Sequence, residues 1–173
     1  MRMKDALRHA VHDDVPPLVD ENSKVLLLGS MLSPKSAEAR FYYAHPQNRF
    51  WRVLAALFDE PLPTDNEARA RLALSHGIAL WDVVGSCDIV GALDSTIKNV
   101  VYNDVKKLTE RYPSIGRIYA TGGKAHSLLM KYAETAGSPV ISAAERLPST
   151  SPQNFGFSLD KLVAEYSVIK EYL

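Results

Sequence analysis

The apolar residues of this chain fall into short runs separated by stretches with helical spacing, a pattern typical of a parallel sheet. Residues 25–28, VLLL, form a run that is short and β-prone enough for a strand buried on both faces. Similar runs predict three further strands, at residues 78–81, 117–121 and 139–142. The pattern therefore predicts a four-stranded, mainly parallel sheet.

The stretches between these runs predict helices that cover the sheet. Apolar residues recur at helical intervals from Phe50 to Phe58, and Pro61 follows as a helix-ending residue. Further helices are predicted at residues 67–76 (ended by Gly77), 103–111 (capped by Asn103), 124–136 and 158–172. Strands that alternate with helices in this way indicate an α/β fold, here a single three-layer α/β/α domain.

Two segments outside this alternation are interpreted as irregular. Residues 1–24 are mixed and polar, and Pro16-Pro17 blocks a helix, so we expect a loosely attached N-terminal arm ahead of a domain at residues 25–173. Residues 85–99 carry scattered Gly, Ser and Asp and are interpreted as a loop.

Composition narrows the class of protein. The chain has 173 residues with 20 basic and 20 acidic side chains, so its net charge is zero. A neutral chain does not favour binding of nucleic acid through phosphate neutralisation alone. Zero net charge does not exclude a local contact with DNA through backbone N–H groups and hydroxyls. The single cysteine, Cys87, suits a reducing compartment and is interpreted as a buried structural thiol. His9 and His12 lack close partners for a metal, and no run is long enough for a membrane span, so we expect a cytoplasmic protein without a metal.

Candidate chemistry gathers where the first strand ends. Gly29-Ser30 forms a turn directly after that strand, and Asn48 stands at the start of the helix that follows. Open α/β sheets bind ligands at the rim formed by the carboxyl ends of their strands. Asp82 ends the second strand at the same rim, where it could be a further polar group of the site or the cap of a loop. Asp94 is equally undecided.

Three motifs resemble one family. GSMLS at residues 29–33 is followed by YYAHPQNRFW at 42–51, and LPSTSPQN stands at 147–154. Together they resemble the uracil-DNA glycosylase superfamily, most closely its DNA-deoxyinosine (hypoxanthine-DNA) glycosylase branch. The resemblance implies a monofunctional DNA glycosylase of base excision repair. Such an enzyme would flip a deaminated base, hypoxanthine first and uracil second, out of double-stranded DNA and hydrolyse its N-glycosidic bond. It would act as a monomer without a cofactor.

Asn48 is the expected catalytic residue. By position alone Asn48 is more typical of a helix N-cap than of a catalytic residue. The resemblance reverses this preference in favour of catalysis. Better-known branches carry an Asp or Asn in the first turn, where this chain has Met31. An Asn side chain does not ionise, so we expect it to hold a water by its carbonyl rather than act as a strong base.

The resemblance also implies a base pocket. Its backbone cradle would be Gly29, Ser30 and Met31, although a plain turn is the other interpretation of these residues. Phe50 would stack under the extruded base, unless it is an ordinary core residue of its helix. Tyr43 is a weaker candidate on the same rim, and His45 could protonate a purine leaving group or be structural.

DNA contacts are expected from two loops. Ser149, Thr150 and Ser151 would hold the DNA backbone, although this loop could also be a plain Ser/Pro-rich turn. Lys124 could add one phosphate contact, although the Gly pair before it could also serve only for packing. Leu32 stands where relatives carry Pro. Leu147 stands where uracil-specific relatives carry His, which makes strong uracil excision less expected.

Two other functions stay open on this scaffold. The departures at Met31, Leu32 and Leu147 also suit a catalytically inactive nucleotide- or nucleic-acid-binding module. A hydrolase of free nucleosides would share the bond chemistry without needing a DNA-contacting loop.

Overall fold

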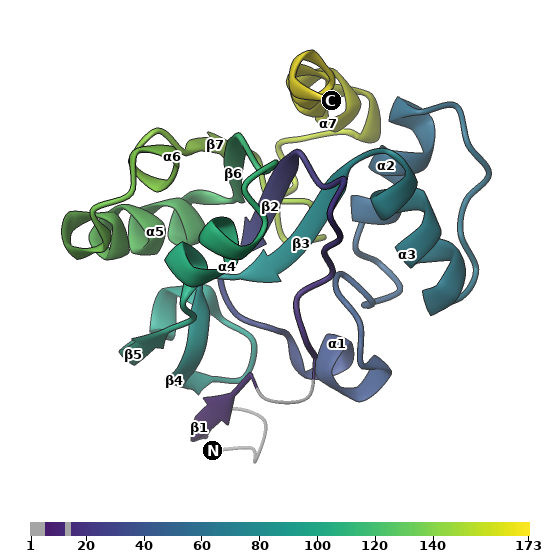
Figure 1. Ribbon diagram of the computed structural model, residues 1–173. Coiled ribbons are helices and arrows are strands. Elements are labelled where there is room, and N and C mark those ends of the chain that lie inside the picture. The colour runs from purple at the N-terminus through teal and green to yellow at the C-terminus, as the bar shows by residue number, and fades with distance from the viewer. Residues whose placement is uncertain (1–5, 13–14) are drawn as a thin grey trace.

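The centre of the protein is a four-stranded parallel sheet. The computed structural model describes residues 6–12 and 15–173. The strands lie in the order β3 (Ile78–Asp82), β2 (Val25–Gly29), β6 (Arg117–Thr121) and β7 (Glu145–Leu147), and every neighbouring pair is parallel (Figure 1). This confirms the predicted α/β sheet.

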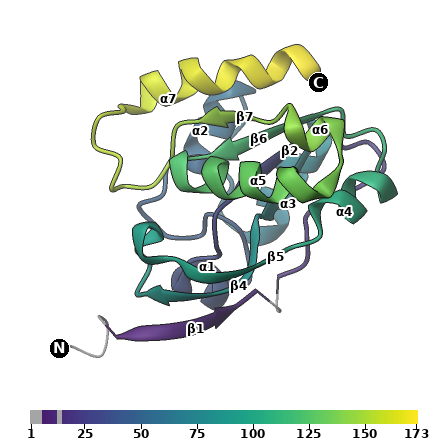
Figure 2. The same cartoon turned by 90° about the vertical axis from the view of Figure 1, so that its left-hand side faces the viewer.

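Helices cover both faces of this sheet because β2 is apolar on both sides. Leu27 packs into a cluster with helices on one face, and Leu26 and Leu28 pack into a second cluster on the other face. The first face carries α2 (Phe50–Leu57), α3 (Asn66–Ser75), α7 (Leu159–Tyr166) and the 3₁₀ helix η3 (Ser167–Tyr172). The second carries α4 (Val105–Arg111) and α5 (Gly123–Ala136) (Figures 1 and 2). The three-layer arrangement is therefore as expected.

A second, antiparallel sheet corrects two predictions. Its strands are β1 (Leu7–Val11), β4 (Val84–Val90) and β5 (Lys98–Tyr102), in the order β1-β4-β5, and they lie beyond one end of the parallel sheet (Figure 2). About half of the loop expected at residues 85–99 is therefore strand, in β4 and the start of β5. The arm expected at residues 1–24 is paired to β4 through β1 and bonded to β3 through Leu18 and Leu80, so its described part is not loosely attached.

Two local predictions were also wrong, each for a physical reason. Residues 139–142 form the short helix α6 (Pro139–Ser142), because a proline fits the first turn of a helix; the fourth strand is β7 instead. The cap of α4 is Asp104, whose carboxylate accepts from the Lys107 N–H at 3.1 Å. Asn103 instead donates its amide to the Asp82 carbonyl at 2.9 Å, which fixes the junction between β3 and β4.

Two short elements complete the fold. The helix α1 (Pro34–Ala39) is capped by Ser33, and the 3₁₀ helix η2 (Asp94–Thr96) follows β4. Among the described residues, no helix is both long and apolar enough to cross a membrane.

Candidate active site

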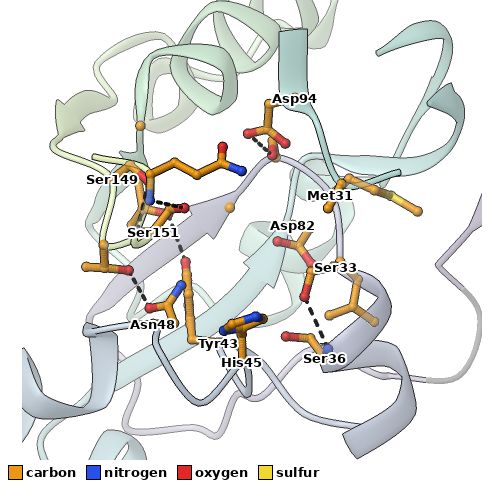
Figure 3. Close-up of a pocket in the computed structure, with 18 of the residues that line it drawn as sticks. Met31, Ser33, Ser36, Tyr43, His45, Asn48, Asp82, Asp94, Ser149 and Ser151 are labelled. Atoms are coloured by element: carbon orange, nitrogen blue, oxygen red, sulfur yellow. Dashed lines mark hydrogen bonds between the residues drawn. The ribbon is translucent and has the colours of Figure 1, made fainter. Parts of the chain in front are cut away.

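The carboxyl ends of β2, β3 and β6 open into a cleft of about 540 Å³. The turn after β2 forms its floor, the segment before α2 forms one wall, and the loop after β7 closes another (Figure 3). The smaller sheet contributes Arg8, which donates to the Gly91 carbonyl at 2.9 Å. Lining residues from the parallel sheet and the two flanking segments include Gly29, Ser30, Met31, Tyr43, His45, Asn48, Asp82, Thr121, Gly122, Ser149, Thr150 and Ser151.

The floor of the cleft requires a glycine at position 29. A Cβ on Gly29 would lie 2.4 Å from Asp82 Oδ1 and 3.5 Å from the Tyr43 hydroxyl, so any side chain there would displace the carboxylate. Next to it, the Ser30 hydroxyl donates to Asp94 Oδ2 at 2.7 Å. Burial raises the pKa of the Asp94 carboxyl, and the hydrogen bond from Ser30 works against that rise. The turn predicted as a cradle does lie in the cleft, between two carboxylates.

Tyr43 and its neighbour Tyr42 line the cleft, whereas Phe50 does not. Phe50 is 0% exposed and is not among the lining residues, because the Tyr43 ring stacks on it at 3.9 Å between centroids and 14° between planes. The Tyr43 hydroxyl is bonded to Thr121 Oγ1 at 2.8 Å, and burial raises its pKa, so it stays a neutral group. Tyr43 therefore lies between Phe50 and the cleft, and Phe50 supports that ring from below.

Tyr43 is held in an unusual backbone conformation. Its φ of +52° lies in the left-handed region, which a bulky side chain rarely adopts. The neighbouring chain holds this turn in place, since the Ala44 N–H donates to the Ser36 hydroxyl at 3.1 Å and Trp51 Nε1 donates to the Tyr42 carbonyl at 3.0 Å. Strained backbone of this kind is concentrated at functional sites.

Asn48 lies at the wall of the cleft, one residue before the N-cap of α2, and its side chain accepts from the first N–H of that helix. Its Oδ1 accepts from the Phe50 N–H at 2.9 Å and from the Thr150 hydroxyl at 2.8 Å. Because a backbone N–H must meet an acceptor, this contact assigns the orientation of the amide. A carbonyl oxygen has two lone pairs, so both are used, and the expected water on this carbonyl is not supported. The group that Asn48 offers to the cleft is its Nδ2 amide, a donor.

The loop after β7 is tied to α2 by a single arginine. The Arg49 guanidinium donates to the Ser151 carbonyl at 2.9 Å, to the Asn154 carbonyl at 3.1 Å and to the Phe157 carbonyl. The Arg49 N–H also donates to the Thr150 carbonyl at 3.1 Å. One side chain therefore sets the distance between the wall that carries Asn48 and the loop that faces it.

Replacing Arg49 with Lys is expected to lower the free energy of unfolding by about 2 kcal/mol, since an ammonium cannot span three carbonyls and leaves some of them unpaired. Urea denaturation measures this change. Arg52→Lys, on the exposed side of the same helix, is the matched control and is expected to change it by less than about 0.5 kcal/mol. Equal stability of the two variants would contradict the role given to Arg49.

The residues predicted to bind DNA separate into two groups. Ser149, Thr150 and Ser151 all line the cleft, and the two serines are half-buried. Thr150 is only 2% exposed, and its hydroxyl donates to Asn48, so Thr150 is poorly placed to contact a phosphate. Lys124 is in the first turn of α5 but not among the lining residues. Arg146 does line the cleft, with its guanidinium within 3.3 Å of the Cβ position of Gly123, and the sequence did not single it out.

Four further titratable groups are His45, Asp82, His12 and Cys87. His45 lines the cleft, and its Nδ1 accepts from the Gln47 N–H at 3.1 Å, so in the neutral ring the proton is on Nε2. Asp82 Oδ2 lies 2.8 Å from Nε2 of His12, a pair separated by 70 residues that no local pattern indicated. Cys87 is buried away from the cleft, and burial raises its pKa. Within residues 6–12 and 15–173, no group of three or more His, Cys, Asp or Glu could hold a metal ion.

Comparison with known proteins agrees with this architecture. The model of the uracil DNA glycosylase superfamily matches residues 16–167. Two relatives named hypoxanthine DNA glycosylase, from Methanosarcina barkeri and Methanosarcina acetivorans, are 34% and 35% identical over 111 residues, which is 64% of this chain and 70% of each relative. The solution NMR structure of a candidate uracil DNA glycosylase from Methanosarcina acetivorans matches with a TM-score of 0.71 at 28% identity, covering 90% of this chain and 96% of that one.

The parallel sheet, the cleft at its carboxyl rim and the family match define the class of protein. The chain belongs to the uracil DNA glycosylase superfamily, which confirms the resemblance of its three motifs. It is a DNA N-glycosylase, a hydrolase that acts on N-glycosyl bonds.

Proposed function

We propose that this glycosylase removes deaminated bases from double-stranded DNA, with hypoxanthine as its first substrate and uracil as its second. The observation that carries the proposal is the Tyr43 ring, which lines a cleft at the sheet rim beside the Asn48 amide. A flat π-face next to a hydrogen-bond donor suits a heterocyclic base. The similar relatives named hypoxanthine DNA glycosylase support the preference for hypoxanthine.

Base flipping would bring the substrate into this cleft. An enzyme that acts on the sugar–base bond within a duplex must extrude the nucleotide to reach it. Ser149, Ser151 and Arg146 line the cleft and would contact the DNA backbone, with Lys124 nearby on α5. Phe155, on the same loop as the two serines, is 91% exposed, and an exposed aromatic ring there is able to enter the stack that the flipped base leaves.

Asn48 would act on the leaving base. Negative charge develops on the base as its bond to the sugar lengthens, and the Nδ2 amide is the part of Asn48 that remains for a ligand. A donor held in place by two hydrogen bonds on its carbonyl needs no reorganisation during the reaction, which is the condition for electrostatic stabilisation of a transition state.

Water, rather than an amine of the protein, would complete the reaction. A Schiff-base mechanism requires an amine nucleophile, and no lysine side chain lines the cleft in the part of the chain that the structure describes. The expected products are the free base and an abasic site in an unbroken strand, formed by a monomeric enzyme.

The proposal is tested by single-turnover assays on three substrates: a duplex with one deoxyinosine, a duplex with one deoxyuridine, and free deoxyinosine. We expect release from the deoxyinosine duplex to be fastest, release from the deoxyuridine duplex to be slower, and the free nucleoside to be inert. Faster cleavage of the free nucleoside would indicate a nucleoside hydrolase. Salt-sensitive duplex binding without release of any base would indicate a binding module.

A further inference from the structure

Most acceptors that line the cleft are already used within the protein. Both lone pairs of the Asn48 carbonyl are occupied, and Nδ1 of His45 accepts from the backbone. The hydroxyls of Tyr43 and Thr121 are bonded to each other. Four serine hydroxyls of the cleft each accept from a backbone N–H: Ser33, Ser36, Ser149 and Ser151. A water that attacks a sugar is activated by a group that takes its proton, and the strongest such groups in this cleft are its two carboxylates.

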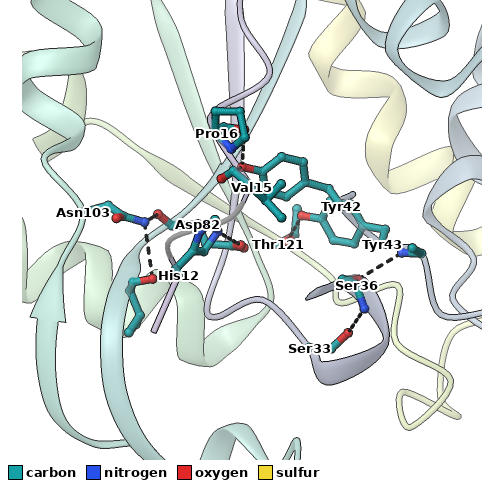
Figure 4. Close-up of polar contacts among 12 residues, drawn as sticks. His12, Val15, Pro16, Ser33, Ser36, Tyr42, Tyr43, Asp82, Asn103 and Thr121 are labelled. Atoms are coloured by element: carbon teal, nitrogen blue, oxygen red, sulfur yellow. Dashed lines mark hydrogen bonds and ion pairs between the residues drawn. The ribbon is translucent and has the colours of Figure 1, made fainter. Parts of the chain in front are cut away.

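The first carboxylate, Asp82, is committed to the fold. Its Oδ2 lies 2.8 Å from Nε2 of His12, whose side chain is fully buried, and this contact joins the two sheets (Figure 4). Its Oδ1 lies against the turn after β2, since a Cβ on Gly29 would come within 2.4 Å of it. Asp82 is only 5% exposed, so little of it can meet a water.

The second carboxylate, Asp94, is the one that the cleft exposes. It begins η2, between β4 and β5 of the smaller sheet, and it is an exposed residue that lines the cleft. Its Oδ2 accepts from the Ser30 hydroxyl at 2.7 Å, which holds the carboxylate against the turn after β2 (Figure 3). Among the residues that the structure describes, none donates to Asp94 Oδ1. One oxygen of Asp94 is therefore fixed, and the other is available to a water.

The surroundings of Asp94 make it a better base than an ordinary carboxylate. Although Asp94 is open toward the cleft, protein on its other sides removes enough solvent to raise its pKa. The hydrogen bond from Ser30 lowers this pKa, the charge of Asp82 raises it further, and the charge of Lys124 lowers it. Two arginines also line the cleft, Arg8 and Arg146. A general base is most effective when its pKa is close to the working pH, and a raised carboxyl pKa moves in that direction.

We propose that Asp94 is the general base that activates the attacking water. As the bond between the base and C1′ of the sugar breaks, the water oxygen bonds to C1′ and a proton of the water passes to Asp94 Oδ1. The electron pair of the broken bond leaves with the base, which takes up a proton from solvent, and Asp94 returns its proton to solvent. The inference rests on the proposed hydrolysis by water and adds the group that activates that water, while Asn48 acts on the leaving base.

Chemical rescue is the first test. Asp94→Ala is expected to slow single-turnover release of hypoxanthine and of uracil alike, by about 10²- to 10³-fold, because both reactions use the same water. Formate can supply a carboxylate in the space that the side chain leaves, and we expect it to raise the rate of the variant at least about fivefold over chloride at equal ionic strength. Wild type is expected to show no such gain.

The pH profile is the second test. Asp94→Asn keeps an acceptor for the Ser30 hydroxyl but cannot take a proton from water. The wild-type rate is expected to fall as the pH drops through the raised pKa of Asp94, because the protonated carboxyl is no longer a base. In Asp94→Asn the rate should be low at every pH, and this acid limb should be absent.

Asp88→Ala is the matched control. Asp88 is a carboxylate of the same small sheet, and it accepts from Asn99 and contacts His9, but it is not among the lining residues. Its variant is expected to stay within a few-fold of wild type and to ignore formate. Wild-type rates in Asp94→Ala overturn the inference, as does a loss that formate does not restore or an acid limb that persists in Asp94→Asn. Failure of wild type to release any base would instead overturn the proposed function.

Discussion

Replacing Asn48 with Asp is expected to slow release of hypoxanthine as severely as replacing it with Ala, by about 10²- to 10³-fold. Asp keeps the oxygen that accepts from the Phe50 N–H and from Thr150, and it removes the Nδ2 donor. It also places a negative charge near a base that gains negative charge as it leaves. Single-turnover base release measures both variants on the same deoxyinosine duplex.

The Asp variant separates two roles for this residue. If Asn48 instead held the attacking water through its carbonyl, Asp would be an equal or better acceptor, and the rate would be kept or raised. Gln47→Ala is the matched control, because Gln47 adjoins Asn48 but is not among the cleft-lining residues. Thermal unfolding of Asn48→Ala accounts for the hydrogen bonds that the variant loses at the start of α2, a loss expected to lower stability by about 1 kcal/mol.

Replacing Tyr43 with Ala is expected to reduce the rate at subsaturating enzyme about 5- to 150-fold, the equivalent of about 1–3 kcal/mol of stacking on one base. Tyr43→Phe keeps the ring and loses only the bond to Thr121, so it is expected to stay within about tenfold of wild type. Enzyme titration under single-turnover conditions separates weaker binding from a slower chemical step.

Phe50 provides the counter-experiment for this assignment. It is buried beneath Tyr43, so Phe50→Leu is expected to lower the free energy of unfolding while the rate per folded molecule stays within a few-fold of wild type. A stable Phe50→Leu variant as inactive as Tyr43→Ala would return the stacking role to Phe50.

Much of the fold was predictable because its parallel strands are apolar on both faces. Continuous runs such as residues 25–28 are distinctive, and helices of 8 or more residues such as α2 and α5 show clear periodicity. The strands of the smaller sheet are half-exposed and interrupted by polar residues, so β4 and β5 were interpreted as a loop. β7 has only three residues, two of them charged, and a neighbouring apolar segment was mistaken for it.

The candidate site was also only partly predictable from the sequence. The rim of a parallel sheet is a rule of topology, and it placed Gly29 and Asn48 correctly in the cleft. The choice between Tyr43 and Phe50 depends on which ring covers the other, and helical spacing does not contain that information. The pair formed by His12 and Asp82 joins two sheets, one of which was not expected, so only the assembled fold brings it together.

The most direct test of the account is identification of the products formed from a duplex with a single deoxyinosine in one turnover of the wild-type enzyme. We expect one equivalent of free hypoxanthine and a strand that stays intact until alkali cleaves it at the abasic site. A strand broken without alkali, with hypoxanthine still attached to its sugar, would contradict the account. So would a duplex that is bound and returned unchanged.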